Sequence, residues 1–362
     1  MRTERIPPAA LDHMAVTELI GAVLLAPVQL PSGPIEKGAR LDPAQAEALQ
    51  AAAGALSGPV VLAWLEADEL HEDEAAWRLA RAVGGQGVIA GPPHQSRVDL
   101  TAERAGVLHV NVEPLSRLNR IDPIEVFTLY HGSAVKAGEV VASVKVAPHV
   151  VPSSVIKKGE AFATGNTRLI RVAPYLPLDV GAIVVEPVTD EELARFEAAV
   201  RRKVTALGGK LDGVAAVAAH SFHEFEAKAR GALEYLVLQR RLQVVLVAGV
   251  SIGDPLSPFL ATLETLGGQI LRRGVPAHPG SMLWLAELSG ARLLGAPHCS
   301  TFIATTAADL ILPRMMTGEA VNAETVAELG HGGLLGPAMR FRFPEYARRD
   351  SVTNMKGEEV KT

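Results

Sequence analysis

The stretch VVLVAGVSIGDP, residues 244–255, decides the fold of the second half of this chain. Its five leading apolar residues predict a buried strand over 244–248, and its two glycines predict a tight loop after that strand. The apolar residues that follow recur at helical spacing, and they predict an amphipathic helix carrying Leu256, Leu260, Leu263 and Leu266 up to Gly267-Gly268. A strand, a glycine loop and a helix in this order are typical of an α/β domain.

The sequence around this stretch alternates strands and helices in the same way. The pattern predicts a strand over Ala182 to Glu186, a helix over Glu191 to Leu207, a strand over Val214 to Ala219 and a helix over Phe222 to Arg240. In the last helix the apolar residues share one face, as Phe222, Phe225, Ala229, Leu233 and Leu236 show. Regular alternation of this kind predicts a parallel, doubly wound sheet in a three-layer α/β domain over residues 172–340.

The first half, residues 1–165, predicts a mixed α/β region with a β-rich part near 106–150. Asp42-Pro43 begins a predicted helix, the acidic run His71-Glu72-Asp73-Glu74 begins another that ends at Val83, and Val140 to Val146 is a predicted strand. Residues 151–170 lack periodicity and hold glycines, so they are predicted to connect two domains. Residues 344–362 are polar and charged, and they predict a flexible tail.

Composition and charge exclude several classes of protein. The chain has 362 residues, of which 48% are apolar, 21% charged and only 4% aromatic, and its formal net charge is −5. Few aromatics and a negative charge argue against nucleic-acid and anionic membrane partners. A single cysteine, Cys299, cannot form an intrachain disulfide, and the longest apolar stretch, Leu19 to Val28, is too short to span a membrane. We therefore expect a cytoplasmic protein.

Three polar loops are predicted to meet at one edge of the second-half sheet. They are Gly249 to Pro255, His278 to Ser281 and Gly295 to Thr301, each rich in glycine or proline. Ligands of open α/β sheets bind outside the carboxyl ends of the strands, so these loops define one candidate crevice. Glycine loops that lead into helices present backbone N–H groups to phosphates and other oxyanions. A turn that serves only the fold is the alternative interpretation.

The order of these motifs resembles the molybdopterin-binding domain of molybdenum-cofactor biosynthesis proteins of the MoeA and MogA type. The matching runs in this chain are GVSIGD, LETLGGQILRRGVPAHPGSMLWLAEL and LLGAPHCS, within about residues 172–320. In the MoeA-type transferases the pattern is TGGVSxGD, a KPGKP-like loop and GLPGNPVS. The resemblance implies a MogA-like α/β domain.

The front half is similar to another part of the same group of proteins. LEADELHEDEAAWRLARAV, GVLHV, LSRLNRIDPIEVFTL and VASVKVAP look like the region that precedes the domain in molybdopterin-binding proteins often fused to a cofactor nucleotidyltransferase. That family carries PGN and GAPGCA where this chain has PGS and GAPHCS, so Cys299 matches a family position. No LAAGxSxRMG-like start of a nucleotidyltransferase occurs here, and cytidylyl transfer is not assigned.

The chain departs from the transferase pattern at positions that matter for anion binding. Val247-Ala248-Gly249 stands in place of a threonine and two glycines, and His278 and Met282 replace the lysines of KPGKP. After the first strand of the domain the transferases carry TGDEL, whereas this chain has Glu186-Pro187-Val188-Thr189-Asp190. This segment is too altered for the roles of the family's residues to be assigned to it. These departures weaken the expectation of metal-insertion chemistry more than that of pterin binding through backbone N–H groups.

The resemblance implies binding of molybdopterin or its nucleotide form, a pterin phosphate, in molybdenum-cofactor biosynthesis, with molybdenum transfer if the chain is catalytic. The implied cofactor-binding residues are Gly249, Val250, Ser251, Gly253, Asp254, Pro279, Gly280, Ser281, Gly295, Pro297, His298 and Cys299. Asp254 is the implied catalytic residue and would hold Mg²⁺. A homo-oligomer and a molybdoenzyme maturation partner are also implied. The alternatives are a non-catalytic cofactor carrier or regulatory module, and an α/β enzyme acting on another nucleotide.

Several of these residues also have a purely structural interpretation. Asp254 could cap the following helix with Pro255 at its first position, and Ser251 could satisfy the loop backbone. Cys299 could bind a metal or take part in redox chemistry, but packing as a small apolar residue is favoured. His71 to Glu74 is favoured as an acidic helix start over a metal cluster, because successive helical residues point in different directions. Asn119 and Asp122 are favoured as a polar turn over a domain-interface pair.

Overall fold

The computed structural model describes residues 1–166 and 168–348, which form two compact units. The first unit comprises Met1–Glu103, Val110–His131 and Gly138–Val172, and the second comprises Arg104–His109, Gly132–Ala137 and Ala173–Thr362. Most of the expected tail, residues 349–362, lies outside the described residues. Its first residues are ordered, because Glu345–Arg348 form helix α13 with Ala347 buried. None of the helices in the described ranges is long and apolar enough to span a membrane.

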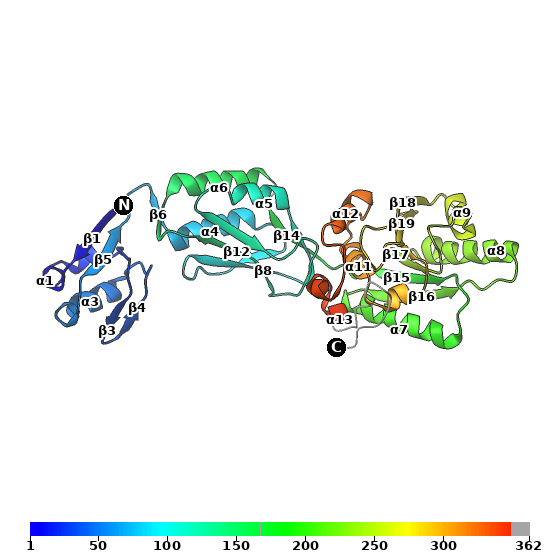
Figure 1. The fold of residues 1–362 in the computed structure, drawn as a ribbon, viewed down its shortest axis with the longest axis horizontal. Coiled ribbons are helices and arrows are strands. Elements are labelled where there is room, and N and C mark those ends of the chain that lie inside the picture. The colour runs from blue at the N-terminus through cyan, green and yellow to red at the C-terminus, as the bar shows by residue number, and fades with distance from the viewer. Residues whose placement is uncertain (167, 349–362) are drawn as a thin grey trace. The chain divides into compact units, whose positions relative to one another are not determined.

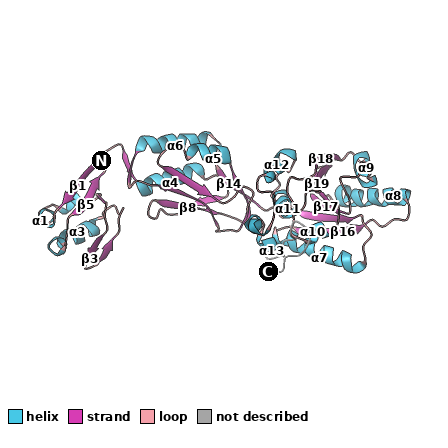
Figure 2. Cartoon of the chain, in the orientation of Figure 1, coloured by secondary structure: helices cyan, strands magenta, loops and turns pink. Residues whose placement is uncertain are grey.

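The beginning of the first unit is a small α/β structure (Figures 1 and 2). Its sheet has the antiparallel order β1-β5-β2, and a second pair, β3 and β4, forms a hairpin. The bounds are β1 Arg2–Ile6, α1 Pro8–Leu11, α2 Val16–Leu19, β2 Val23–Leu24, β3 Val28–Leu30, β4 Gly33–Ile35, α3 Pro43–Ala51, η1 Ala53–Ala55 and β5 Val60–Trp64. The predicted helix start is confirmed, because Asp42 accepts a hydrogen bond from Gln45 N at 2.8 Å and forms a capping box.

The rest of the first unit is an antiparallel sheet in the order β10-β12-β8-β7 with helices α4, α5 and α6. The bounds are β6 Glu69–His71, α4 Glu72–Val83, β7 Val88–Ala90, β8 Arg97–Ala102, α5 Val112–Leu118, β10 Ile124–Thr128, β12 Val140–Val146, β13 Val150–Pro152 and α6 Ser153–Gly165. The acidic start of α4 is confirmed as a helix terminus. Asn119 both donates to and accepts from the backbone of Val126 at 2.8 Å, which gives it the structural role of a polar turn.

The prediction of an aperiodic connection over residues 151–170 is wrong, because α6 occupies most of it. The buried residues Ile156, Gly159 and Ala163 recur at helical spacing. A Cβ on Gly159 would lie 2.6 Å from Ile124 Cδ1 and 2.8 Å from Leu79 Cδ2. The glycine therefore allows close packing of the helix rather than a loop.

The second unit is built on a six-stranded sheet in the order β16-β15-β17-β20-β19-β18. Neighbours among β16, β15, β17 and β20 are parallel, as predicted, but β19 and β18 are antiparallel, so the sheet is mixed. Its elements are β15 Asp179–Val184, α7 Asp190–Ala206, β16 Lys210–Ala216, α8 Phe222–Leu233, η2 Glu234–Gln239, β17 Val244–Ala248, α9 Pro258–Thr265, β18 Gln269–Arg273, β19 Trp284–Leu288, β20 Ala291–Ala296, α10 Ser300–Ile303 and α11 Ala308–Met316. The remaining bounds are β9 Gly106–Val110, β11 Ala134–Val135, β14 Ile170–Pro174, α12 Ala323–Ala327, η3 Glu328–Gly330 and η4 Pro337–Arg342.

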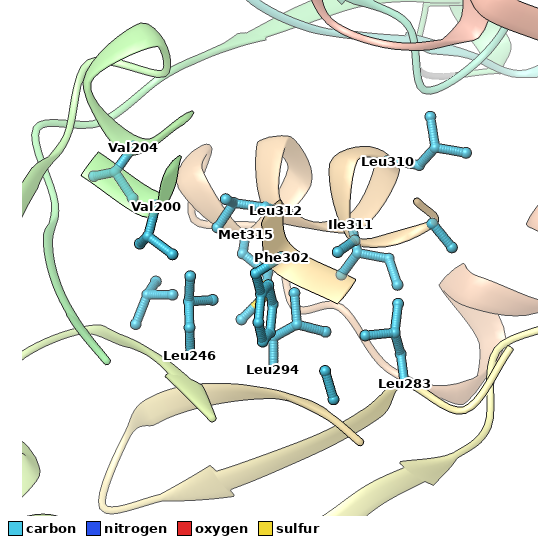
Figure 3. Close-up of a cluster of buried hydrophobic side chains, with 14 of the residues drawn as sticks. Val200, Val204, Leu246, Leu283, Leu294, Phe302, Leu310, Ile311, Leu312 and Met315 are labelled. Atoms are coloured by element: carbon cyan, nitrogen blue, oxygen red, sulfur yellow. The ribbon is translucent and has the colours of Figure 1, made fainter. Parts of the chain in front are cut away.

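Side-chain alternation along the central strands produces the three layers of this unit. Val244, Leu246 and Ala248 of β17 pack with residues of α7, α10 and α11, whereas Val245 and Val247 pack with residues of α8, η2 and α9. Figure 3 shows the first of these cores, where Phe302 and Leu294 lie beside Leu246 below the helix that carries Leu312 and Met315. Because helices cover both faces of this sheet, the groups that a ligand could reach lie in the loops at the ends of its strands.

Candidate functional site

Two of the three loops predicted to converge follow the carboxyl ends of neighbouring parallel strands, and the third precedes the antiparallel strand β19. Residues 185–189 follow β15, residues 249–257 follow β17 and residues 297–301 follow β20. Residues 278–283 precede β19, whose first residue Trp284 pairs with Gly295 at the end of β20. All four segments therefore lie at one edge of the sheet, which we call the loop edge.

Gly249 brings the first two of these segments together. Its φ is +88°, and a Cβ at this position would lie 2.6 Å from Glu186 N and 2.9 Å from Glu186 Cβ. Any other residue would be strained and would push the two backbones apart. The glycine thus has a packing role at the loop edge whether or not a ligand binds there.

Val250 and Gly295 are buried in the wall of the site. The Val250 N–H donates to Ala296 O at 3.0 Å, and Trp284 Nε1 donates to Val250 O at 3.0 Å. A Cβ on Gly295 would overlap the ring of Trp284, which is fully buried. These contacts explain why the chain has a glycine and a buried apolar residue at these motif positions.

Ser251 to Asp254 form an exposed turn. Ser251 Oγ accepts from Gly253 N at 3.3 Å, and Asp254 Oδ1 accepts from Leu256 N at 2.9 Å. The prediction that Asp254 caps the next helix with Pro255 at its first position is wrong. Helix α9 begins at Pro258 and its N-cap is Ser257, because an extra turn separates Asp254 from the helix. The second carboxylate oxygen of Asp254 makes no hydrogen bond or ion pair within the described part of the chain.

The segment before β19 lies against this turn. A Cβ on Gly253 would lie 3.4 Å from Met282 Cε, and Pro279 O accepts from Ala307 N at 2.9 Å. Gly280 has a φ of +113° and faces the Ala307 backbone, where a Cβ would approach to 2.8 Å. His278 is held by its backbone, since its N–H donates to Gly333 O at 2.8 Å.

Glu186 is a residue of the loop edge that the sequence analysis did not select. Its Oε1 accepts from Cys299 N at 2.5 Å, and its Oε2 lies 3.1 Å from His298 Nδ1. Partial burial would raise the pKa of Glu186, but the hydrogen bonds from Cys299 and His298 outweigh it and hold this pKa below its usual value. The only available signal was its position at the end of the strand predicted over residues 182–186, where the altered TGDEL segment begins.

The thiol of Cys299 packs as an apolar side chain. It is 7% exposed and belongs to the same core as Phe302. Burial, followed by the neighbouring Glu186 carboxylate, raises the pKa of this thiol far above the usual range. Because only the thiolate is a good nucleophile and metal ligand, the geometry favours the packing interpretation over metal or redox chemistry.

We expect iodoacetamide to alkylate Cys299 at pH 8.5 at least about tenfold more slowly in the folded protein than in urea, because the thiolate is scarce and buried. The chain has a single cysteine, so mass spectrometry reads the reaction directly. Glu186→Gln removes one cause of the raised pKa and should speed the reaction, whereas Glu287→Gln, an exposed residue of β19, should not. An equal rate in folded and unfolded protein would contradict this account of the thiol.

Backbone N–H groups are the main hydrogen-bond donors left at the loop edge. In the described residues no acceptor is found for the N–H groups of Ser251, Ile252, Gly280, Ser281, Met282, His298 and Ser300. No lysine or arginine occurs in 185–189, 249–257, 278–283 or 295–301. Adjacent free N–H groups form concave sites for oxyanions, so the arrangement can bind an anion without a cationic side chain.

Metal ligands are sparse at this edge. Among residues 1–166 and 168–348, no group of three or more His, Cys, Asp or Glu side chains is placed to hold a metal ion. This also applies to His71 to Glu74, where His71 Nδ1 accepts from Asp73 N at 3.3 Å and Glu72 contacts His149 at 2.7 Å. Mg²⁺ bound to phosphates needs only one or two carboxylates, a requirement that Asp254 could meet only together with a bound phosphate.

Comparisons with known proteins find fold neighbours alone. No family model matches, and no curated protein matches the sequence. The solved structures similar to this chain include the molybdopterin biosynthesis enzyme MoaB from Thermus thermophilus, with 13% identity and a TM-score of 0.26 over 39% of this chain and 98% of that one. They also include a molybdopterin biosynthesis MoeA protein from Pyrococcus horikoshii, with 14% identity and a TM-score of 0.28 over 69% of this chain and 74% of that one. At TM-scores this low, neither structure indicates what this chain binds.

Proposed function

We propose that this chain binds molybdopterin, or its nucleotide form, at the loop edge. The observation that carries the proposal is the set of unpaired N–H groups on the turn that holds Ser251 and on the segment that holds Gly280. These two segments belong to the GVSIGD and HPGS motifs, and Met282 lies against Gly253 where they meet. The pterin phosphate would accept hydrogen bonds from these donors. Mg²⁺, if it accompanies the ligand, would be shared between the phosphate and Asp254.

The test is calorimetric titration of the full chain with molybdopterin, comparing wild type with Met282→Glu. Met282 is 43% exposed and borders the proposed phosphate position, so a carboxylate there should repel the ligand and weaken binding about tenfold or more. Leu238→Glu is the matched control, because Leu238 is 44% exposed and belongs to η2, near the opposite end of the sheet. Binding weaker than millimolar in the folded wild-type protein would rule out the proposal, and equal effects of the two variants would remove the ligand from the loop edge.

A second candidate, a non-catalytic carrier or regulatory module for molybdoenzyme maturation, is favoured by the lack of lysine and arginine at the loop edge. Transfer of a metal to a pterin dithiolate benefits from positive groups that stabilise developing charge, and none is present there. The discriminating measurement is complementation of a transferase-deficient strain. Growth that Asp254→Ala abolishes, with binding retained, would support catalysis by the carboxylate, whereas no complementation by the wild type would support the carrier.

The proposal also includes the cellular location and the self-association of the protein. A cytoplasmic location agrees with a chain that has one cysteine, and self-association follows from the family that the motifs resemble. Mass analysis of the small molecule that copurifies with the protein tests the ligand, and light scattering of the same sample tests the oligomer. A nucleotide without a pterin in that sample would instead favour an α/β enzyme with another substrate.

A further inference from the structure

A pocket of about 310 Å³ lies in the first unit, and no residue of the loop edge lines it. We call it the Trp77 pocket, and it is lined by Trp77, Ala80, Arg81, Gly84, Gly85, Val88, Ala90, Leu100 and Arg168. Its residues come from the second half of α4, the following glycines, β7 and β8, together with Arg168, which lies two residues before β14. Its volume is at the low end of the roughly 300–1,000 Å³ of small-molecule sites, which suits a ligand of one or two rings.

The pocket combines an apolar floor with an exposed aromatic ring. Ala80 and Leu100 are fully buried, and Val88 is half-buried beside them. Trp77 is 39% exposed, although tryptophan is normally among the more buried residues of a folded domain. A planar group that enters the pocket would cover this exposed apolar surface.

Arg81 supplies a positive charge that the described fold does not use. Its guanidinium carbon lies 4.7 Å from the centroid of the Trp77 ring, and no carboxylate among the described residues pairs with it. Arg78, one turn earlier on the same helix, differs in this respect, because it forms two hydrogen bonds with Glu160 at 2.9 and 2.7 Å. Arg81 stacked on a ring thus keeps its donors available for an anion.

Arg168 prevents the end of α4 from repelling such an anion. The last carbonyls of a helix carry partial negative charge. Arg168 Nη1 donates to Arg81 O at 3.0 Å and to Gly84 O at 2.8 Å, so a cation covers these carbonyls. Arg168 does so from a backbone with a φ of +59°, a conformation that is uncommon for a residue other than glycine.

We propose that the Trp77 pocket binds a small anion in which a planar aromatic ring system is joined, directly or through a linker, to a carboxylate or a phosphate. The ring would lie on the apolar floor beside Trp77, and the acidic group would accept hydrogen bonds from Arg81. A free inorganic anion would leave the apolar floor uncovered, and a neutral ring would leave Arg81 without a counter-ion. The site is independent of the pterin proposal, because it shares no residue with the loop edge.

The experiment titrates the full chain with adenosine 5′-monophosphate and with salicylate, using adenosine and inorganic phosphate as probes that carry only one of the two features. Binding is measured by calorimetry at constant ionic strength and by tryptophan fluorescence. Trp77 is the reporter, because Trp284 is fully buried and Trp64 does not line the pocket, and Trp77→Phe identifies its contribution. We expect at least one of the two aromatic anions to bind below about 1 mM and to change the Trp77 emission, and we expect adenosine and phosphate to bind at least about tenfold more weakly.

Arg81→Gln should weaken binding of that anion about tenfold, since it removes the charge and leaves the fold intact. Arg117→Gln is the matched control: Arg117 also lies over a ring, that of Phe162 at 5.5 Å, but does not line the pocket, and its substitution should change nothing. Met282→Glu should leave the Trp77 signal unchanged, which separates this site from the loop edge. Failure of both anions to bind, or wild-type affinity in a folded Arg81→Gln protein, would overturn the proposal.

Discussion

Gly295→Ala should lower the free energy of unfolding of the second unit by about 3 kcal/mol, the upper end of the usual cost of overpacking a core. The added Cβ would overlap the ring of Trp284, and this ring can move away only by breaking contacts of its own. It is fully buried, packs on Phe259 at 6.3 Å between centroids, and donates to Val250 O. Relief of the overlap would therefore also disturb the start of the GVSIGD turn.

Urea unfolding followed by the fluorescence of Trp284, with Trp64 and Trp77 replaced by phenylalanine, measures this effect in the second unit alone. Gly336→Ala is the control, because a Cβ at Gly336 meets no atom within 4 Å and its φ is −72°. The double variant Gly295→Ala with Trp284→Leu, followed by circular dichroism, should lose less stability than the sum of its two parts. Gly295→Ala unfolding at the wild-type urea concentration would show that the ring is not held as described.

Lys203→Met should cost about 3–5 kcal/mol of stability, because it leaves a buried carboxylate without its counter-charge. Lys203 Nζ lies 2.8 Å from Asp309 Oδ1, and both side chains are no more than 3% exposed. The same ammonium donates to Ala304 O at 2.9 Å, while Asp309 Oδ2 accepts from Thr306 N at 3.0 Å. This pair joins α7 to the start of α11, and Figure 3 shows the core formed by their apolar neighbours, Val204 of α7 and Leu310 of α11 among them.

Lys210→Met provides a matched comparison, because Lys210 Nζ also lies 2.8 Å from an aspartate, Asp212, but its side chain is 71% exposed. Removal of such a surface pair costs at most about 1 kcal/mol. The double variant Lys203→Met with Asp309→Leu should recover much of the loss, since it removes both buried charges. If chemical denaturation gives Lys203→Met and Lys210→Met the same free energy of unfolding, burial does not determine how much the Lys203–Asp309 pair contributes to stability.

Gly295→Ala and Lys203→Met disturb different parts of the second unit. Gly295 and Trp284 fix the turn that would present N–H groups to a ligand. Lys203 and Asp309 instead join α7 to α11, which cover the face of the sheet opposite to the one on which Trp284 packs. If these variants lose stability but their folded fraction keeps its ligand affinity, the loop edge is formed by local contacts. If stability and ligand affinity fall together, the whole domain is needed to form it.

Local sequence signals predicted much of the secondary structure. The strand over 244–248, the strand over 140–146 and the start of α4 have the predicted positions, because apolar runs and helix-start residues act over a few neighbours. Prediction failed where a local signal had a tertiary cause. Gly159 suggested a loop, but it lies in a helix that packs closely on Leu79 and Ile124.

The sequence by itself determined which segments could meet, because strands that alternate with helices place their following loops at one edge of a sheet. Only the tertiary structure decided what those segments do there. It turned Asp254 away from the helix start, buried the Cys299 thiol, placed Gly295 under a tryptophan and brought Glu186 to Cys299 from 113 residues away in the chain. The physical reason is that N–H pairing, burial and pKa depend on neighbours that are distant in sequence, and these neighbours become fixed only when the sheet forms.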